Sequence, residues 1–166
     1  MYLVTPKNIH MKRLFLLYLG LFGMLFVSCK QEEKTLKEYM TDSWQTTYIK
    51  IEMPTFQKSD TTNVFEDKFE NNPARIVQSK YNSDGSFSTW SLNREGEKYG
   101  NSEGVWGVKG DSLFLEFYYD GRNVKEAYQI EKTENGFQGK SKYDWDKDGE
   151  FDDLLIMKTK RIKLEE

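Results

Sequence analysis

The sequence predicts an all-β protein, an eight-stranded antiparallel meander that closes into a barrel after a short N-terminal helix. Segments rich in aromatic and β-branched residues recur at short intervals along the 166-residue chain. Turn dipeptides such as Asp120-Gly121 and Asn135-Gly136 separate them, and these dipeptides favour the tight turns of antiparallel hairpins. A meander of eight strands has two exposed edges unless it closes, so we expect one barrel domain over residues 34–163.

The elements follow in order along the chain. Leu36, Tyr39 and Met40 have the i, i+3, i+4 spacing of one helix face. Residues 54–73 form the one long connection and carry Phe56, Phe65 and Phe69. Long loops are usually functional or disordered, so we expect a lid whose three phenylalanines contact a ligand. The expected strands are 44–53, 75–82, 86–93, 104–108, 112–119, 123–132, 136–143 and 153–162.

The N-terminal region has the pattern of a secretory signal peptide over residues 1–28. Lys12 and Arg13 precede fourteen uncharged residues, 14–27, which as a helix would span about 21 Å, less than the roughly 30 Å of a bilayer core. Because Met11 begins the pattern cleanly, it is a candidate for the working start.

The end of this run, Leu25-Phe26-Val27-Ser28-Cys29, resembles the lipobox of bacterial lipoproteins. The resemblance implies cleavage before Cys29 and acylation of its sulfur, with residues 29–33 as a lipidated tether; several acyl chains anchor a protein to a membrane firmly. The alternative is a buried cysteine in an ordinary membrane anchor. Phe26 and the acidic stretch after Cys29 are similar to lipoproteins of the Bacteroidota, which implies the outer membrane and exposure at the cell surface.

Composition excludes several classes of function. Without residues 1–28 the chain has 21 Lys and Arg against 27 Asp and Glu, a net charge of −6, which disfavours nucleic acid as a partner. The cut also removes His10, the only histidine, and leaves one cysteine. This excludes Ser-His-Asp and Cys-His catalysis and intrachain disulfides. Paired carboxylates can hydrolyse glycosides without histidine, but no spacing singles out a pair, so we expect no enzyme.

The order of elements in the mature chain has a recognisable layout: a helix precedes Asp42-Ser43-Trp44, a long loop follows the first strand, and Lys160-Arg161 ends the last one. With this layout the chain resembles a lipocalin-like barrel, and in particular small lipocalin-like lipoproteins of the Bacteroidota. The resemblance implies that Trp44 and Arg161 pack together as a structural pair. Asp42 stands where lipocalins have glycine.

The sharpest polar motif is the run from Asp144 to Asp153. Alternating aspartates before a glycine resemble a calcium loop, because oxygens at positions 1, 3 and 5 can converge on one hard cation. The EF-hand glutamate is missing, since Leu155 occupies position 12. The alternatives are a non-EF-hand calcium turn and a solvated acidic hairpin tip. The candidate calcium ligands are Asp144, Asp146, Asp148, Glu150 and Asp152.

These features predict a non-enzymatic, lipid-anchored outer-membrane protein that binds a small hydrophobic ligand in its barrel. Calcium is the one cofactor for which the sequence offers a candidate site. The alternative function is a structural or protein-interaction module with a filled barrel. A barrel axis blocked by Trp44, Trp90, Trp106 and Phe114 would favour this alternative.

Overall fold

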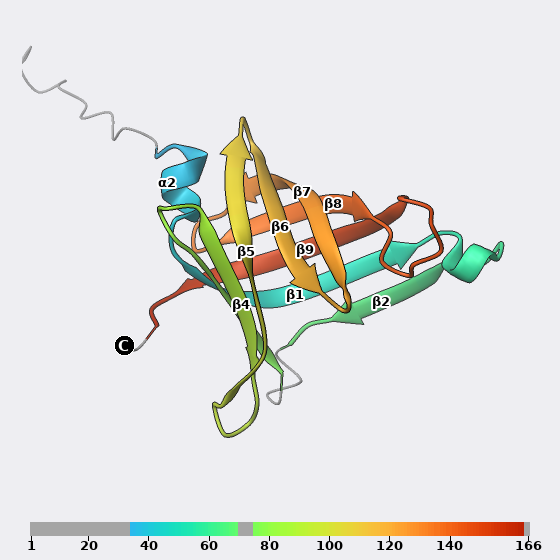
Figure 1. The fold of residues 1–166 in the computed structure, drawn as a ribbon, viewed down its shortest axis with the longest axis horizontal. Helices are drawn as coiled ribbons and strands as arrows, with labels where there is room; N and C mark the ends of the chain where they lie inside the picture. The colour runs from blue at the N-terminus through green and yellow to red at the C-terminus, as the bar shows by residue number, and fades with distance from the viewer. Residues whose placement is uncertain (1–33, 70–74, 165–166) are drawn as a thin grey trace, which may run out of the picture. The chain divides into compact units, whose positions relative to one another are not determined.

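The computed structural model describes residues 34–69 and 75–164, which form a β-barrel (Figure 1). Its only α-helix among these residues is short, and a single 3-10 turn, η2, follows the first strand. The leader, His10 and Cys29 lie outside the described residues. The elements are α2 (Leu36–Met40), β1 (Ser43–Met53), η2 (Phe56–Lys58), β2 (Asn63–Asp67), β3 (Ile76–Tyr81), β4 (Ser86–Leu92), β5 (Lys98–Lys109), β6 (Ser112–Tyr119), β7 (Arg122–Lys132), β8 (Phe137–Tyr143) and β9 (Asp153–Ile162).

The predicted eight-stranded antiparallel barrel is confirmed. Strands β3 to β9 pair with their neighbours in sequence order, and β1 pairs with β3 on one side and with β9 on the other. The β1–β9 ladder runs from Ser43 opposite Ile162 to Glu52 opposite Leu154. This ladder closes the sheet, so the meander has no long open edge there. The arrangement is compatible with a lipocalin-like fold.

The connection over residues 54–73 differs from the expected plain loop. It contains η2 and a ninth strand, β2, which pairs antiparallel with the second half of β1 so that Phe65 lies opposite Ile51. Because β3 pairs only with Ser43, Trp44 and Gln45, the rest of that edge of β1 is free to accept β2. Strand β5 also begins earlier than expected, at Lys98 rather than at residue 104.

Helix α2 is fixed at both ends by side chains. Thr35 and Glu38 form a capping box at its N-terminus, which satisfies backbone donors that a helix leaves free. At its other end the Trp44 indole Nε1 donates to the Met40 carbonyl at 3.0 Å. The Tyr39 hydroxyl donates to the Gly136 carbonyl at 2.5 Å, before β8. The helix therefore lies at one end of the barrel, opposite the end where β8 turns into β9 (Figure 1). Of the helices among the described residues, none is long and apolar enough to cross a bilayer.

Large apolar side chains fill the barrel interior. Trp44 and Leu113 are 0% exposed and Phe137 is 1% exposed, and the rings pack against one another, as where Trp44 meets Phe137 edge to face at 5.0 Å. Such pairs stabilise a core beyond simple burial. The core cluster consists of Met40, Trp44, Tyr81, Phe87, Trp106, Leu113, Leu115, Tyr128, Ile130, Phe137 and Leu155.

The sequence offered Trp44, Trp90, Trp106 and Phe114 as a test of whether side chains fill the barrel, and the structure places these four residues differently. Trp44 and Trp106 belong to the core cluster. Trp90 is buried but lies outside that cluster; its Nε1 donates to the Gln78 side chain and Lys98 lies over its ring. Phe114 points outward and is 44% exposed. Of the four residues, only Trp44 and Trp106 therefore belong to the packed interior.

Candidate functional site

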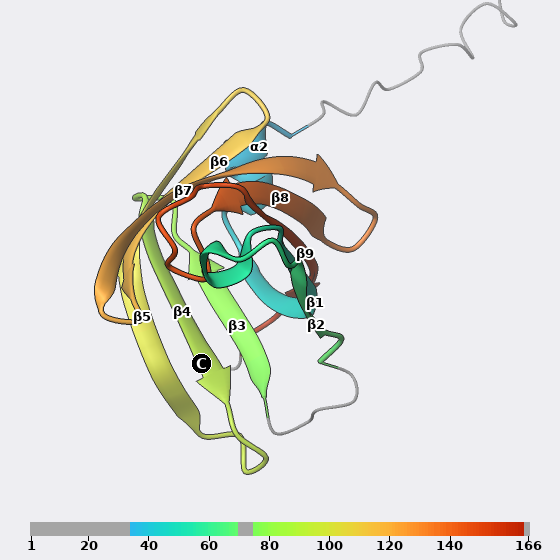
Figure 2. The same cartoon turned by 90° about the vertical axis from the view of Figure 1, so that its right-hand side faces the viewer.

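The acidic connection between β8 and β9, residues 144–152, lies across one end of the barrel beside η2 (Figure 2). Trp145 packs against the core cluster and its ring lies 5.2 Å from that of Tyr143. Phe151 meets Tyr143 edge to face at 5.6 Å. These aromatic contacts fix the loop over the barrel mouth and bring its carboxylates together.

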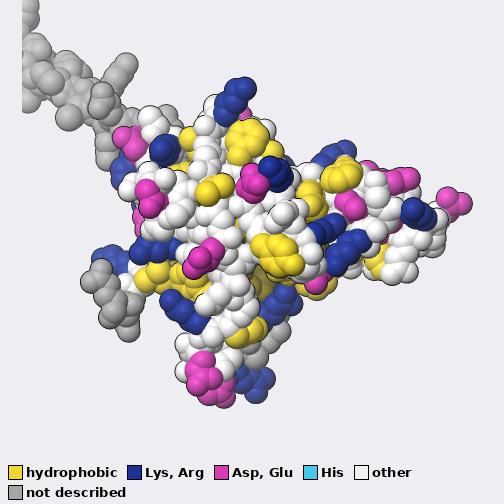
Figure 3. All heavy atoms as spheres, in the orientation of Figure 1, with side chains coloured by type: hydrophobic (Ala, Val, Ile, Leu, Met, Phe, Trp, Pro, Cys, Tyr) yellow, Lys and Arg dark blue, Asp and Glu magenta, His cyan; other side chains and the backbone are white. Residues whose placement is uncertain are grey.

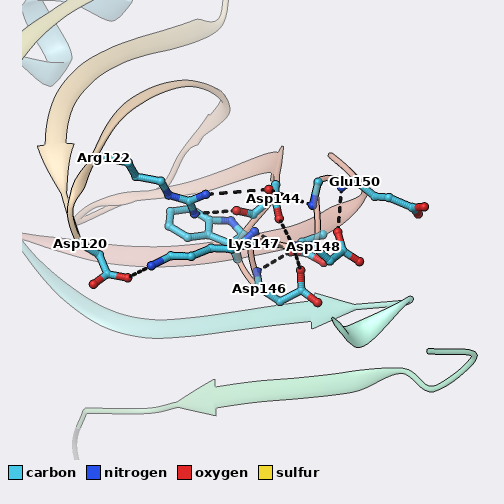
Figure 4. A network of polar contacts seen from close by, with 10 residues as sticks. Asp120, Arg122, Asp144, Asp146, Lys147, Asp148 and Glu150 are labelled. Carbon is cyan, nitrogen blue, oxygen red and sulfur yellow. Dashed lines mark hydrogen bonds and ion pairs between the residues drawn. The ribbon is translucent and has the colours of Figure 1, made fainter. Parts of the chain in front are cut away.

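Hydrogen bonds inside the loop curl its backbone around the carboxylates (Figure 4). The Asp148 N–H donates to Asp144 Oδ1 at 3.0 Å and to Asp146 Oδ1 at 3.1 Å. The Gly149 N–H donates to Asp144 Oδ2 at 3.3 Å, and the Glu150 N–H donates to Asp148 Oδ1 at 2.7 Å. Gly149 has φ +94°, a conformation that favours glycine. The alternating aspartates thus accept hydrogen bonds from consecutive backbone N–H groups, so that the backbone of the loop turns around their carboxylates.

Three carboxylates of this region lie close enough to share a cation. Asp144, Asp146 and Asp153 each offer an oxygen within 4.8 Å of the others. The sequence singled out Asp144 and Asp146, but it missed Asp153, which begins β9 and is 2% exposed. An aspartate directly before the apolar run from Leu154 to Met157 was the sequence signal that could have identified it.

The other three predicted ligands have different surroundings. Asp148 Oδ2 and Glu150 Oε2 both accept from the Thr55 hydroxyl, at 3.4 and 3.3 Å. Asp152 Oδ1 is buried and has no hydrogen-bond partner among the described residues. The structure therefore groups Asp144 and Asp146 with Asp153, while Asp148 and Glu150 face the turn before η2.

The electrostatics of the loop leave much of its negative charge unpaired. Burial raises the pKa of Asp153, although the N–H groups of Trp145 and Asp146 donate to its carboxylate at 2.6 and 3.2 Å. Lys147 points away from the cluster and binds Asp120 at 2.5 Å, which lowers the pKa of Asp120. An all-oxygen cluster with excess negative charge has the chemistry of a site for a hard divalent cation.

Arg122 is the positive group that reaches this cluster among the described residues. Its Nη2 donates to the Asp144 carbonyl at 2.6 Å, and Nη1 lies 3.9 Å from Asp144 Oδ2. Its guanidinium also lies over the Tyr143 ring, 5.0 Å from the centroid. The Nε atom is buried and has no hydrogen-bond partner in this part of the chain. Arg122 thus connects the start of β7 with the acidic loop.

The short turn η2 docks on the acidic loop from the other side. The Gln57 N–H donates to Asp146 Oδ2 at 2.8 Å. Gln57 and Lys58 both have positive φ, +53° and +61°, which costs energy for residues other than glycine. Between the two loops lies a polar hollow of about 470 Å³ lined by Thr55, Lys58, Ser59, Asp60, Asp148, Gly149 and Glu150. A ligand bound to Asp146 would therefore affect both loops.

The three phenylalanines expected in the lid have different exposures. Phe56 is partly buried, Phe65 is 42% exposed on β2, and Phe69 is 8% exposed. Their common role in ligand binding stays a prediction.

Trp44 and Arg161 are in contact. The Arg161 guanidinium lies over the Trp44 ring, 4.8 Å from the centroid, and over the Tyr39 ring at 5.0 Å. Arg161 Nη1 also forms an ion pair with Asp42 at 3.2 Å. The arginine therefore covers the tryptophan at the α2 end of the barrel, as the lipocalin-like resemblance implies.

The outer face of β5 and β6 carries exposed apolar side chains. Val105, Phe114 and Tyr118 are 57, 44 and 60% exposed. Glu116, between the two β6 aromatics, forms an ion pair with Lys125 of β7 at 2.9 Å. Figure 3 shows hydrophobic side chains interspersed with charged ones on the side of the barrel that bears these strands. A hollow of about 440 Å³ runs beside Phe114, between the small residues Gly107 and Ala127.

No family model matches this chain, and no curated protein matches it. The functional argument therefore depends on the geometry of the barrel, its acidic loop and its outer face.

Proposed function

We propose that this chain is a non-enzymatic, lipid-anchored protein of the bacterial outer membrane that binds another protein through the outer face of β5 and β6. One observation carries this proposal: apolar side chains fill the barrel interior, while a further set is exposed outside it. Exposed apolar side chains that gather on one face and are bordered by polar residues often mark an interaction site on a folded domain. We infer that the barrel serves as a rigid support for that face.

The composition of the outer face suits a protein partner. Aromatic residues contribute most to protein–protein binding energy when a partner covers them. Phe114 and Tyr118 of β6 supply two aromatic groups. Val105 is on the neighbouring strand β5, which pairs with β6 on one side and with β4 on the other. The charges of Glu116 and Lys125 neutralise each other in an ion pair. The hollow beside Phe114 can accept one side chain of a partner.

Site-specific photo-cross-linking in cells tests this proposal. A photoreactive phenylalanine derivative at position 114 should give a discrete adduct, and the same group at Lys140, exposed on β8, should not. Adding Val105→Glu should abolish the adduct at position 114, because it removes an exposed apolar side chain and places a second carboxylate opposite Glu116. Adducts of equal yield at both positions, or an adduct that Val105→Glu leaves unchanged, would contradict the proposal.

The lipid anchor is supported by the lipobox resemblance alone, since Cys29 lies outside the described residues. Metabolic labelling with a radioactive fatty acid tests it. The wild-type chain should be labelled and should fractionate with the outer membrane. Cys29→Ser should lose the label, and a mutant that is still labelled would refute the anchor.

Calcium binding by the acidic loop is part of the proposal. Its support is the group formed by Asp144, Asp146 and Asp153, together with the excess of carboxylates over cations there. A bound cation would reduce repulsion between these carboxylates and fasten the loop to the barrel mouth.

A second candidate function is carriage of a small hydrophobic ligand. It is favoured by the short pairing of β7 with β8, which is limited to four residue pairs and leaves a place where the barrel wall can part. Native mass spectrometry of protein extracted gently from its source membrane distinguishes the two functions. A filled barrel should give the mass of the lipidated chain alone, whereas a carrier should retain a ligand of stoichiometric mass.

A further inference from the structure

The wall of the barrel has a seam between β7 and β8. Main-chain pairing of these strands begins at Lys132 opposite Phe137 and ends at Gln129 opposite Lys140. Strand β7 extends back to Arg122 and β8 continues to Tyr143. Over this stretch β7 keeps its partner β6 and β8 keeps β9. We call the stretch between residues 122–128 and 141–143 the seam.

Side chains, not main-chain hydrogen bonds, cross the seam. The Ser141 hydroxyl of β8 donates across the seam to Glu126 Oε1 of β7. On the same strand as Glu126, the Tyr128 hydroxyl donates to Glu126 Oε2 at 2.6 Å. Glu126 is 4% exposed, and Ser141 and Tyr128 are each 5% exposed. Arg122 binds Asp144 at the mouth end of the seam. Glu126 is therefore the buried carboxyl on which the middle of the seam closes.

An open hollow lies close to this buried cluster. A surface hollow of about 240 Å³ follows the outside of the seam, and its lining includes Tyr128 and Ser141 besides the exposed Lys140 and Lys142. Residues on both faces of the strands line the same hollow because the two strands diverge there. A small separation of β7 from β8 would connect the hollow to the Glu126 carboxyl.

The groups that face Glu126 do not supply a counter-charge. On β8 the facing group is the neutral Ser141, with Lys140 and Lys142 turned to solvent, and on β6 the residue opposite Glu126 is Leu115. On β9 the residue opposite Ser141 is Leu155.

The remaining titratable groups come from β3 and β7. Tyr81 of β3 and Tyr128 of β7 lie near Glu126, and burial raises the pKa of both, so they stay neutral at physiological pH. Arg122 lies four residues back on the same strand, and the acidic loop already binds it. Among the described residues around the seam, Glu126 is thus the group that titrates near neutrality.

We propose that the seam between β7 and β8 is a pH-controlled gate, closed while Glu126 is protonated and opened when its carboxyl group ionises. A protonated carboxyl can remain buried, because its O–H donates to one of the two hydroxyls while its carbonyl oxygen accepts from the other. A buried carboxylate without a cation is costly, and hydration through the adjacent hollow relieves that cost.

The chemistry of the cluster sets the pH range of the gate. Burial raises the pKa of Glu126 to about 7, against the opposing effect of the hydrogen bonds from Ser141 and Tyr128. In the open seam the carboxyl regains an ordinary pKa. Because the closed state then holds the proton more tightly than the open state, opening should increase on the order of fiftyfold between pH 5 and pH 8, mostly below pH 7.

Hydrogen exchange of the full-length protein, followed by mass spectrometry, tests the gate. Protection factors corrected for the intrinsic pH dependence of exchange should fall between pH 5 and pH 8 for peptides that cover residues 129–132 and 137–140, because the main-chain pairs there border the seam and loosen when it opens. These peptides therefore report on the seam. Peptides from the β1–β9 ladder, which pairs along most of its length, provide the reference and should keep their protection. Constant protection at the seam over this pH range would overturn the proposal.

Two variants separate the carboxyl from general loosening of the wall. Glu126→Gln keeps the shape and cannot ionise, so seam protection should no longer depend on pH. If the Glu126→Gln protein folds and seam protection still depends on pH, another group must cause the pH response, and the gate is refuted. If that variant does not fold, Ser141→Ala is the second test: it should open the seam more at pH 5 and retain a pH response. Loss of that response in Ser141→Ala, with Glu126 intact, would equally overturn the proposal.

Discussion

Gly104 of β5 lies where this strand passes closest to its partner β6. A Cβ atom at this position would overlap the Glu116 carbonyl oxygen and approach the Phe117 Cβ to 2.7 Å. Both contacts involve atoms that the β5–β6 ladder holds in place. Gly107, three residues later on the same strand, has open space around the corresponding position. The two glycines therefore differ in packing although they share a strand.

Substitution of these glycines tests this packing. Gly104→Ala should lower the free energy of unfolding by about 3 kcal/mol, because the strands must separate to admit one methyl group. Gly107→Ala should change it by less than about 1 kcal/mol. Urea denaturation at constant pH measures both. Equal effects of the two substitutions would show that β5 does not approach β6 as described.

The contact of Arg161 with Trp44 leads to a second prediction. Arg161→Lys keeps the charge but loses the planar group that covers the indole ring, so it should cost about 1 kcal/mol. Lys160→Arg, on the exposed neighbouring residue, serves as a control and should have little effect. Urea midpoints compare the two variants, and no difference between them would argue against a stabilising stack.

At the scale of elements, the acidic loop joins β8 to β9 and docks on Thr55 and on η2, so a bound cation should stabilise both connections. At a calcium concentration 100 times the dissociation constant, linkage gives a stabilisation of about 2.7 kcal/mol. This corresponds to several degrees in the melting temperature of a domain of this size. Differential scanning calorimetry with calcium and with a chelator measures the shift.

Variants of the loop locate the calcium response. Asp146→Asn with Asp148→Asn should abolish the response while the barrel still folds, because the β8–β9 ladder runs from Tyr143 opposite Asp153 without these side chains. Asp153→Asn tests the ligand that only the structure identifies. If neither calcium nor a chelator changes the melting temperature of the wild-type chain, the loop is a solvated turn and not a calcium site.

Most elements could be predicted because local chemistry determines them. Asp-Gly and Asn-Gly turns mark where hairpins reverse, and the helical spacing of Leu36, Tyr39 and Met40 matches α2. Strand β2 could not be predicted in the same way. Four of its five residues are exposed, so it has no alternating apolar pattern, and it exists because β1 offers a free edge. The stability of β2 therefore depends on its pairing with β1 and not on its own sequence pattern.

At the scale of the whole molecule, the filled barrel gives inside and outside positions very different energetic weights. Leu113 and Phe114 are consecutive on β6, yet Leu113 is 0% exposed within the core and Phe114 is 44% exposed outside. Leu113→Ala should cost about 3 kcal/mol because it leaves a cavity among packed side chains. Phe114→Ala should cost about 1 kcal/mol or less, although it removes more atoms.

Chemical denaturation of the two variants measures these costs. A loss at Leu113 as small as that at Phe114 would mean that the interior tolerates a void, and would favour the ligand-carrier function over the filled module. Leu113→Ala should bind an apolar fluorescent probe more tightly than the wild-type protein does if the interior is normally full.

The candidate site was only partly predictable from sequence, because a loop motif shows which residues are near in sequence and not which are near in space. Asp144 and Asp146 follow from the repeat of aspartates. Asp153 joins them because β9 returns beside β8, and Gln57 donates to Asp146 from a position 89 residues away. The outer face of β5 and β6 was equally hidden, since both faces of β6 are aromatic in sequence and only barrel closure decides which is inside.

The ladder between β1 and β9 has a consequence for how the chain acquires its structure. The two strands are the first and the last of the domain in sequence, yet they pair with each other, with Ser43 opposite Ile162. The ring therefore cannot close until nearly the whole chain is available. Pairing between such distant segments has a large loop-closure entropy, and topologies dominated by it fold slowly. A folding chain would therefore remain an open sheet and complete its ring only when the last strand is available. Until then the free edges of β1 and β8 would need protection from premature association.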